Sequence, residues 1–296
     1  MTINPMTTPN TPDSFSPDLT VFTPGDAVPD ALILRASTVV TTELEGDAPV
    51  ARVPWVNDAD AQFVPEGTFI EPAAPTPDEI TVTTGKIAQV VTVSREQWHQ
   101  QSTAGLLSNS VTRAVTKAGN QAFLAQPTGQ GYPPLTGISN TEGIIEGQDV
   151  TTSLDPIADV IAEIENNGGT PNLIIANPLS FGALRNLKTG EGSYTSLLGA
   201  GTADVERKLL GVEVVTSPAV PEGELIVIDS TAIASAVGPV QIAQSEHAHF
   251  AYDSIAVRVT WRIGWAVQHA DRLGKLTVTV PSEEGSDEGT DAGTDE

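Results

Sequence analysis

Apolar and polar residues alternate most regularly near the C-terminal end of the chain. The apolar residues that occupy every second position there are Ile255, Val257, Val259, Trp261, Ile263, Trp265 and Val267. Successive side chains of a β-strand point to opposite faces, so the pattern predicts one long strand with one buried face. Arg258 and Arg262 fall together on the other face. There they could pair with acids of another subunit, or extend their guanidinium groups into water.

A helical pattern begins at Ser94. Ser94 and Gln97 have the spacing of a capping box, and Val93 and Trp98 occupy the positions of a hydrophobic staple. The apolar stripe that follows, at steps of three or four, is Leu107, Val111, Ala114, Ala118, Ala122 and Ala125. We therefore predict about 31 residues of helix, roughly 45 Å long at 1.5 Å per residue. Its narrow, Ala-rich stripe predicts close packing across a flat surface.

The chain before this helix makes a long excursion. Strand patterns occur at 51–67 and 79–94, and the Pro-rich stretch "EPAAPTP" stands between them at 71–77. Together they predict an antiparallel hairpin whose apolar residues are dense at the base and few at the tip. A polar, Pro-stiffened tip has no core of its own to join, so we interpret it as half of an interface.

A compact α/β region is predicted in the third quarter of the chain. An N-cap residue followed by Pro begins a helix at Asp155 and another at Asn177. Short apolar strands are expected at 172–176, 211–216 and 224–229. This succession of helices and strands predicts a subdomain of about 70 residues, within the usual range of domain sizes.

Composition narrows the possible functions. The 296 residues include 26 Gly, 22 Pro and no Cys, and the net charge is -24. The charge opposes a main role in gripping nucleic acid, and the lack of Cys excludes disulfides and thiolate chemistry. No basic leader or apolar span of about 20 residues occurs, so we expect a soluble product without a membrane partner. We expect the acidic segment 282–296 to be a disordered tail.

Catalytic motifs are weak. "TGQGYPP" at 128–134 and "KTGEG" at 188–192 lack the complete patterns of phosphate-binding loops, and no nucleophile elbow occurs. We therefore predict no enzymatic activity and no cofactor. A metal site built on His247, His249 and His269 is one alternative, although no local spacing fixes a third ligand. A monomeric, strand-rich binding module is another.

Several stretches, taken in order, resemble one known family. They are "PEGTFIEPAAPTPDEITVTTGKIAQVVTVSREQW", "GISN", "ANPLSFGALRNLKTGEGSY", "LLGVEVVTSPAVPEGELIVID" and "HFAYDSIAVRVTWRIGWAVQHADRLGKL". In order and spacing they are similar to the major capsid protein of tailed bacteriophages, over roughly residues 30–280. Encapsulins and the floor of herpesvirus shells share this α+β fold, and an encapsulin-type compartment is the nearest alternative.

The resemblance implies a division of the chain. The implied parts are an N-terminal arm (1–30), the start of the peripheral domain (31–56), an extended loop (57–86), the peripheral domain with its spine helix 95–126 (87–151), an axial domain (152–225), the return strands of the peripheral domain (226–281) and the acidic tail (282–296). The long strand of the family corresponds to 250–270. In the family the extended loop lies over a neighbouring subunit.

The resemblance also implies a structural function in an icosahedral virion capsid that encloses double-stranded DNA. The chain would form hexamers and pentamers with itself in the host cytoplasm and contact the DNA only weakly. A separate scaffolding protein, a portal and a decoration protein are the other expected partners. The candidate interface residues are Phe69, Glu71, Pro72, Pro75, Pro77, Asp78, Glu79, Arg258 and Arg262. Some members cross-link through a Lys at the loop tip, but Lys86 lies on the return limb here, so we predict no such cross-link.

Overall fold

The computed structural model describes nine stretches of the chain, in two compact units. The described residues are 19–42, 50–57, 63–67, 69, 76–98, 103–131, 134–188, 196–198 and 207–279. The first unit comprises the described parts of 1–140 and 233–268, and the second those of 141–232 and 269–296. Within these ranges no helix has both the length and the apolar character that a membrane span requires.

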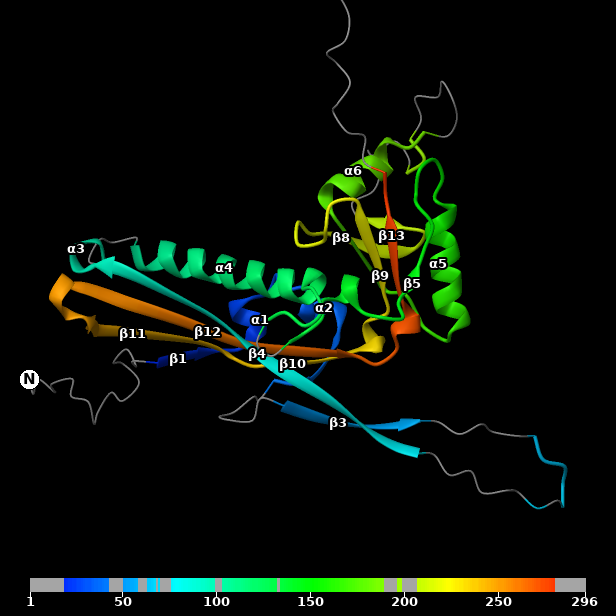
Figure 1. The fold of residues 1–296 in the computed structure, drawn as a ribbon, viewed down its shortest axis with the longest axis horizontal. Helices are drawn as coiled ribbons and strands as arrows, with labels where there is room; N and C mark the ends of the chain where they lie inside the picture. The colour runs from blue at the N-terminus through cyan, green and yellow to red at the C-terminus, as the bar shows by residue number, and fades with distance from the viewer. Residues whose placement is uncertain are drawn as a thin grey trace, which may run out of the picture. The chain divides into compact units, whose positions relative to one another are not determined.

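The first unit is built on a sheet with β12 (Ser254–Val267) at its centre (Figure 1). β4 (Thr76–Ser94) pairs antiparallel with one side of β12. β11 (Val240–His249) and β10 (Ile233–Val237) pair antiparallel with its other side, one after the other along its length. The predicted long strand is therefore confirmed, and it organises the whole unit.

Shorter elements complete this unit. β1 (Leu19–Phe22) pairs with β11, and β2 (Thr38–Thr41) pairs in parallel with β10. β3 (Val50–Asn57) pairs with β4. The short helices of the unit are α1 (Pro24–Ala27), α2 (Ile33–Ala36), α3 (Arg95–Trp98), η1 (Ile138–Asn140) and η3 (Phe250–Tyr252). Residues 19–27, within the predicted N-terminal arm, thus form β1, α1 and the turn between them, and residues 1–18 lie outside the described residues.

The long helix α4 (Thr103–Ala125) packs on the face of β12 that carries the alternating apolar residues. Its buried residues are Val111, Val115, Gly119, Phe123 and Leu124. The predicted Ala-rich stripe is therefore wrong in part, since Ala118 is exposed. A Cβ on Gly119 would lie 2.6 Å from the ring of Trp261. The helix approaches the sheet closely as predicted, but it does so at a glycine that the pattern of apolar residues did not include.

The tryptophans of β12 anchor this layer. Trp261 is 1% exposed, and its Nε1 donates a hydrogen bond to the Gly238 carbonyl at 3.0 Å. The Nε1 of Trp265 donates to the Thr136 carbonyl at 2.7 Å, and its ring meets that of Phe123 edge to face at 5.4 Å. Buried tryptophans need a partner for their N–H group, and both have one. The two indole rings and their hydrogen bonds thus fix the part of the sheet that lies beneath the C-terminal half of α4. A cavity of about 100 Å³ remains between the N-terminal half of α4 and the sheet.

The second unit is an α/β domain on a six-stranded sheet, counted over its described residues, in the order β5-β13-β9-β6-β8-β7. Its strands are β5 (Ile145–Glu146), β6 (Leu173–Ala176), β7 (Lys208–Leu209), β8 (Val212–Thr216), β9 (Glu224–Ile228) and β13 (Leu273–Thr277). Its helices are α5 (Asp155–Asn166), α6 (Pro178–Asn186), η2 (Ser230–Ala232) and η4 (Ala270–Arg272). The strands predicted at 172–176, 211–216 and 224–229 are all present.

The two predicted helix starts in this unit differ in detail. The Asn177 side chain accepts a hydrogen bond from the Leu179 amide at 2.9 Å, which confirms it as the N-cap of α6. The N-cap of α5 is Leu154 rather than Asp155. Ser153 Oγ accepts a hydrogen bond from the Asp155 amide at 3.4 Å and donates one to Asp155 Oδ2 at 2.9 Å, so Asp155 is held as the first residue of the helix.

Candidate subunit interface

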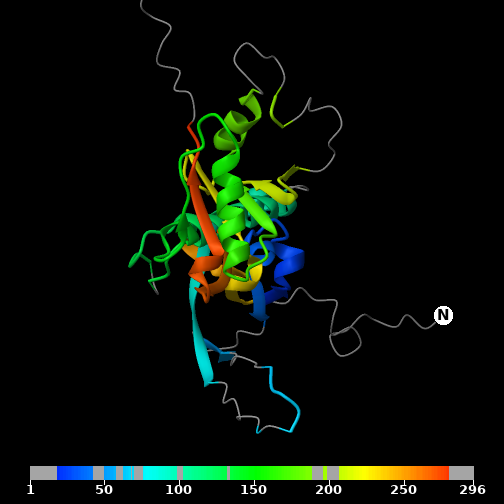
Figure 2. The same ribbon diagram turned by 90° about the vertical axis from the view of Figure 1, so that its right-hand side faces the viewer.

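Strand β4 belongs to two ladders, and this divides it into two halves. Its residues 84–94 pair with β12, whereas, among the described strands, its residues 76–83 pair with β3 alone. The β3–β4 hairpin therefore leaves the sheet at Thr83 and Thr84 and continues beyond it, as the cyan strand in Figure 1 and Figure 2 shows. This is the extended excursion that the sequence predicts.

The hairpin crosses the sheet over a set of small residues. A Cβ on Gly264 of β12 would lie 2.2 Å from the Thr83 carbonyl oxygen, so only glycine leaves room for β4 here. Beside this point the fully buried Val82 packs with Ala234 and Ala236 of β10. Val82 is buried although Lys86, on the same side of β4, is exposed. The base of the hairpin thus packs on the sheet face opposite α4.

The described part of the hairpin tip carries exposed apolar side chains. Phe63 is 108% exposed and Phe69 is 84% exposed, and Val64 is also exposed. Phe69 was predicted as an interface residue, whereas Phe63 and Val64 were predicted to lie in a strand and are found outside any strand. An aromatic ring in water forgoes the burial that large apolar side chains normally gain, and such groups mark contact surfaces. Of the predicted interface residues, Phe69 has the surroundings that a contact residue needs.

The structure describes some of the other residues predicted at the hairpin tip and leaves the rest outside the described ranges. Glu79 forms an ion pair with Arg52 of β3, Nε to Oε1, at 3.2 Å, and both side chains are largely exposed. Exposed pairs of this kind contribute only about 0–1 kcal/mol. Pro77 and Asp78 lie in β4, while Glu71, Pro72 and Pro75 lie outside the described residues. Glu79 therefore has a partner inside its own hairpin, which sequence alone did not indicate.

A basic surface occupies the sheet face opposite α4. Arg258 and Arg262 lie on this face as predicted, and the register places Val90 beside Arg258 and Lys86 beside Arg262. Val90 is 60% exposed. We call the part of this face formed by the exposed Lys86, Ala88, Val90 and Arg258 and the half-buried Arg262 the open face. Lys86 was missed as a member because the register between β4 and β12 cannot be read from the sequence.

The open face carries the positive charges of Lys86, Arg258 and Arg262. Within the part of the chain that the structure describes, Lys86, Arg258 and Arg262 form no ion pair. The register partners on this face in β11 are Ala243 and Gln241, opposite Arg258 and Thr260, and neither is acidic. Positive charge beside exposed aliphatic side chains suits a partner that is acidic and apolar at once.

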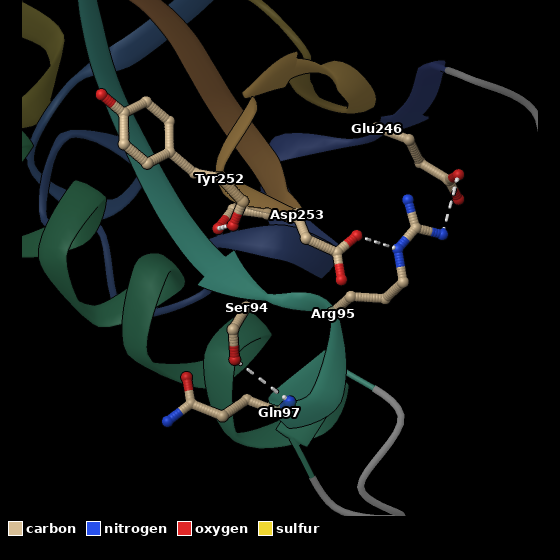
Figure 3. Close-up of polar contacts among 7 residues, drawn as sticks. Ser94, Arg95, Gln97, Glu246, Tyr252 and Asp253 are labelled. Atoms are coloured by element: carbon tan, nitrogen blue, oxygen red, sulfur yellow. Dashed lines mark hydrogen bonds and ion pairs between the residues drawn. The ribbon is translucent and has the colours of Figure 1, made fainter. Parts of the chain in front are cut away.

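A polar cluster fixes the far end of the sheet, where β11 turns into β12 (Figure 3). Arg95 Nε lies 2.8 Å from Asp253 Oδ1, and Arg95 Nη1 lies 3.6 Å from Glu246 Oε2. The hydrogen bond and charge of Asp253, assisted by Glu246, raise the pKa of Arg95 above its ordinary value.

The helix α3 begins beside this cluster. The Ser94 Oγ accepts a hydrogen bond from the Gln97 amide at 3.3 Å, which confirms the predicted cap. Tyr252, in the short helix η3 that joins β11 to β12, is 80% exposed.

The histidines that the structure describes are not grouped into a metal site. The ladder of β11 shifts register between Ser245 and His249, so the simple alternation assumed for His247 and His249 does not hold. His269 belongs to the second unit. Among the described residues no group of three or more His, Asp or Glu side chains is arranged to hold a metal ion.

The fold is that of phage major capsid proteins. The capsid protein of an empty GTA particle matches 84% of this chain with 89% of its own, at 16% identity and a TM-score of 0.66. A chain of the Gordonia phage Cozz structure matches 85% of this chain with 87% of its own, at 14% identity and a TM-score of 0.66. A chain of the Microbacterium phage Oxtober96 structure matches 93% of this chain with 100% of its own, at 12% identity and a TM-score of 0.62. None of the curated proteins compared with the chain matches it.

The family model described as "Phage capsid family" matches residues 27–278. The chain therefore belongs to the phage capsid family, and it is a structural protein of the capsid shell of a tailed phage. The resemblance drawn from the sequence is confirmed. Of the two shell-forming alternatives, the virion capsid is the one that these comparisons support.

Proposed function

We propose that this chain assembles with copies of itself into hexamers and pentamers, which close into an icosahedral shell around double-stranded DNA. Membership of the phage capsid family supports the shell. Repeated head-to-tail contacts between identical subunits generate rings when the rotation closes. In this proposal the chain acts as a structural element and catalyses no reaction.

The observation that carries the proposal is the β3–β4 hairpin. Beyond Thr83 the described part of β4 pairs only with β3, and the described tip exposes Phe63 and Phe69. A two-stranded hairpin is marginally stable in water by itself and gains stability by packing on another surface. A neighbouring copy would supply that surface, since every subunit of a shell has an identical neighbour.

The acidic charge supports a shell that holds DNA without gripping it. With a net charge of -24, the chain has few cations to neutralise phosphates. Weak contact would let DNA slide as it is packaged. A separate scaffolding protein, a portal and a decoration protein complete the proposed set of partners, and assembly takes place in the host cytoplasm.

The test is the assembly state of the purified protein. Sedimentation velocity and negative-stain electron microscopy should show rings or polyhedral shells for the wild type. A variant lacking residues 68–79 should remain folded by circular dichroism but should form no stable shells. A wild type that remains a small monomer at high concentration would overturn the proposal, as would normal shells from the deletion variant.

A further inference from the structure

We propose that the cavity beneath the N-terminal half of α4 is a binding site for a small, uncharged, apolar molecule of about the size of benzene. Residues in or directly beside α1, α3, α4, β11 and β12 line this cavity, and all of them belong to the first unit. The inference goes beyond the proposed function, because it concerns a ligand of the single subunit and not a contact between copies. A molecule bound there would contact the helix and the sheet together.

The chemistry of the lining sets the class of ligand. None of the described side chains that line the cavity is charged, and Thr112 carries the one hydroxyl group among them. A charged ligand would lose its hydration in such a place without gaining an ionic partner. Water also fits poorly, because a buried water molecule needs two to four polar partners. The cavity therefore selects uncharged, apolar molecules.

The two halves of α4 meet side chains of different size, which explains why the space is there. The helix runs beside β12 (Figure 1). Its C-terminal half packs over the indole rings of Trp261 and Trp265. Around its N-terminal half the sheet presents Val240, Val257 and Val259 instead. A valine extends less far from a sheet than an indole does, so the sheet does not fill the gap beneath this half of the helix.

The lining is buried on one side and partly exposed on the other. Val111 and Val115 of α4 are buried, as are the three valines of the sheet. Trp98, at the end of α3, and Leu107, near the start of α4, are partly exposed. The exposed side gives a small molecule a way in, and the buried side gives it an interior in which it is removed from water.

The volume of the cavity sets the size of the ligand. It measures about 100 Å³. An engineered cavity of about 150 Å³ in another protein, lined by Leu, Ile and Phe, stays dry and binds benzene or xenon. The side chains around an empty space lack contacts on one side, and a ligand that fills the space restores their dispersion attraction. The present cavity is smaller than the engineered one, so a single six-membered ring or a xenon atom fits it best.

Thermal unfolding of the full chain in the presence of benzene tests the proposal. A ligand at ten times its dissociation constant shifts the unfolding equilibrium about elevenfold. For a unit of this size this corresponds to a rise in Tm of about 3–6 °C. The rise should follow a saturation curve as the benzene concentration increases. Benzoate, which has the same ring and a negative charge, should leave Tm unchanged.

A variant with a filled cavity locates the effect. Val257→Ile/Val259→Ile adds two methyl groups to the lining, so it should melt at or above the wild-type temperature and should lose most of the benzene-induced rise. The matched control is Val214→Ile/Val227→Ile, which makes the same changes on two strands in the core of the second unit. This control should melt below the wild type because its core is already packed. It should keep the full benzene-induced rise.

Xenon provides a second measurement that does not depend on the variants. Crystals of the wild type exposed to xenon gas should contain a xenon atom beside Val111, Val257 and Val259. A crystal without xenon there, or a wild type whose Tm does not respond to benzene, would overturn the inference. An equal rise with benzoate, or an equal rise in the filled variant, would place the binding elsewhere and overturn it too. A chain that binds benzene but never assembles would leave this inference standing and overturn the proposed function alone.

Discussion

Replacement of Gly264 by alanine should damage the fold at the point where the hairpin crosses the sheet. The new Cβ would lie 2.2 Å from the Thr83 carbonyl oxygen and 2.8 Å from the Thr84 α-carbon. Both are backbone atoms, so no side-chain rotation relieves the clash and β4 itself must move. Overpacking of this kind costs about 1–3 kcal/mol, which exceeds the roughly 0.5–1 kcal/mol that alanine gains over glycine in chain entropy. We expect a net loss of about 1–2 kcal/mol.

Thermal unfolding followed by circular dichroism measures this loss. For a domain of this size each kcal/mol shifts Tm by about 2–4 °C, so Gly264→Ala should lower Tm by about 2–8 °C. The control is Gly25→Ala in α1 of the same unit, where a Cβ would meet nothing within 4 Å. It should melt at or slightly above the wild-type temperature. If Gly264→Ala melts with the wild type, the close approach of β4 is not what requires glycine.

Three further substitutions test particular residues. Ser94→Ala should destabilise by about 1 kcal/mol in urea unfolding, because the cap of α3 is lost. Leu210→Asn should stabilise by about 1 kcal/mol in the same assay, because leucine has a φ of 50° in a tight turn that favours asparagine. Burial raises the pKa of Glu224, with Lys275 opposing the shift, so the folded state favours its protonated form. Its contribution to stability therefore falls as pH rises above the ordinary value of 4.5, and Glu224→Gln should stabilise at pH 7 but not below pH 4.5.

Each of these predictions has an outcome that contradicts it. No change for Ser94→Ala would mean that the 3.3 Å contact with Gln97 contributes nothing. A less stable Leu210→Asn variant would show that the leucine side chain contributes more by packing than its backbone costs. Parallel pH profiles for the wild type and Glu224→Gln would show that the buried Oε2, which has no hydrogen-bond partner among the described residues, does not govern proton binding.

The elements with a strong local period were predictable from sequence. The strict alternation of apolar and polar residues predicts β12, and the Asn-Pro pair at 177 and 178 predicts the start of α6. Both signals lie within one segment of the sequence. The stripe of α4 was only partly predictable, since Gly119 faces the sheet and hydrophobicity alone favours the alanines. A glycine at a helix contact is recognised only when the opposing Trp261 is known.

The candidate interface was less predictable because it depends on register. Arg258 and Arg262 share a face by simple alternation, but Lys86 joins them through pairing across more than 170 residues of sequence. Similarly, nothing local indicates that Glu79 pairs with Arg52, or that β4 changes partner at Thr84. Phe69 was among the predicted interface residues, but the exposure of Phe63 was missed because its surroundings at 51–67 have the pattern of a strand.

The double membership of β4 has a mechanical consequence for a shell. A pull on the hairpin by a neighbouring subunit acts along β4, and the hydrogen bonds between β4 and β12 run across that direction. The residue pairs from Ser94–Ser254 to Thr84–Gly264 therefore share the force in shear and do not open one at a time. At the far end the Arg95–Asp253 contact joins the end of β4 to the start of β12. In the proposed shell, tension in the hairpin would enter the longest ladder among the described strands, and β4 would act as a tie between neighbouring copies.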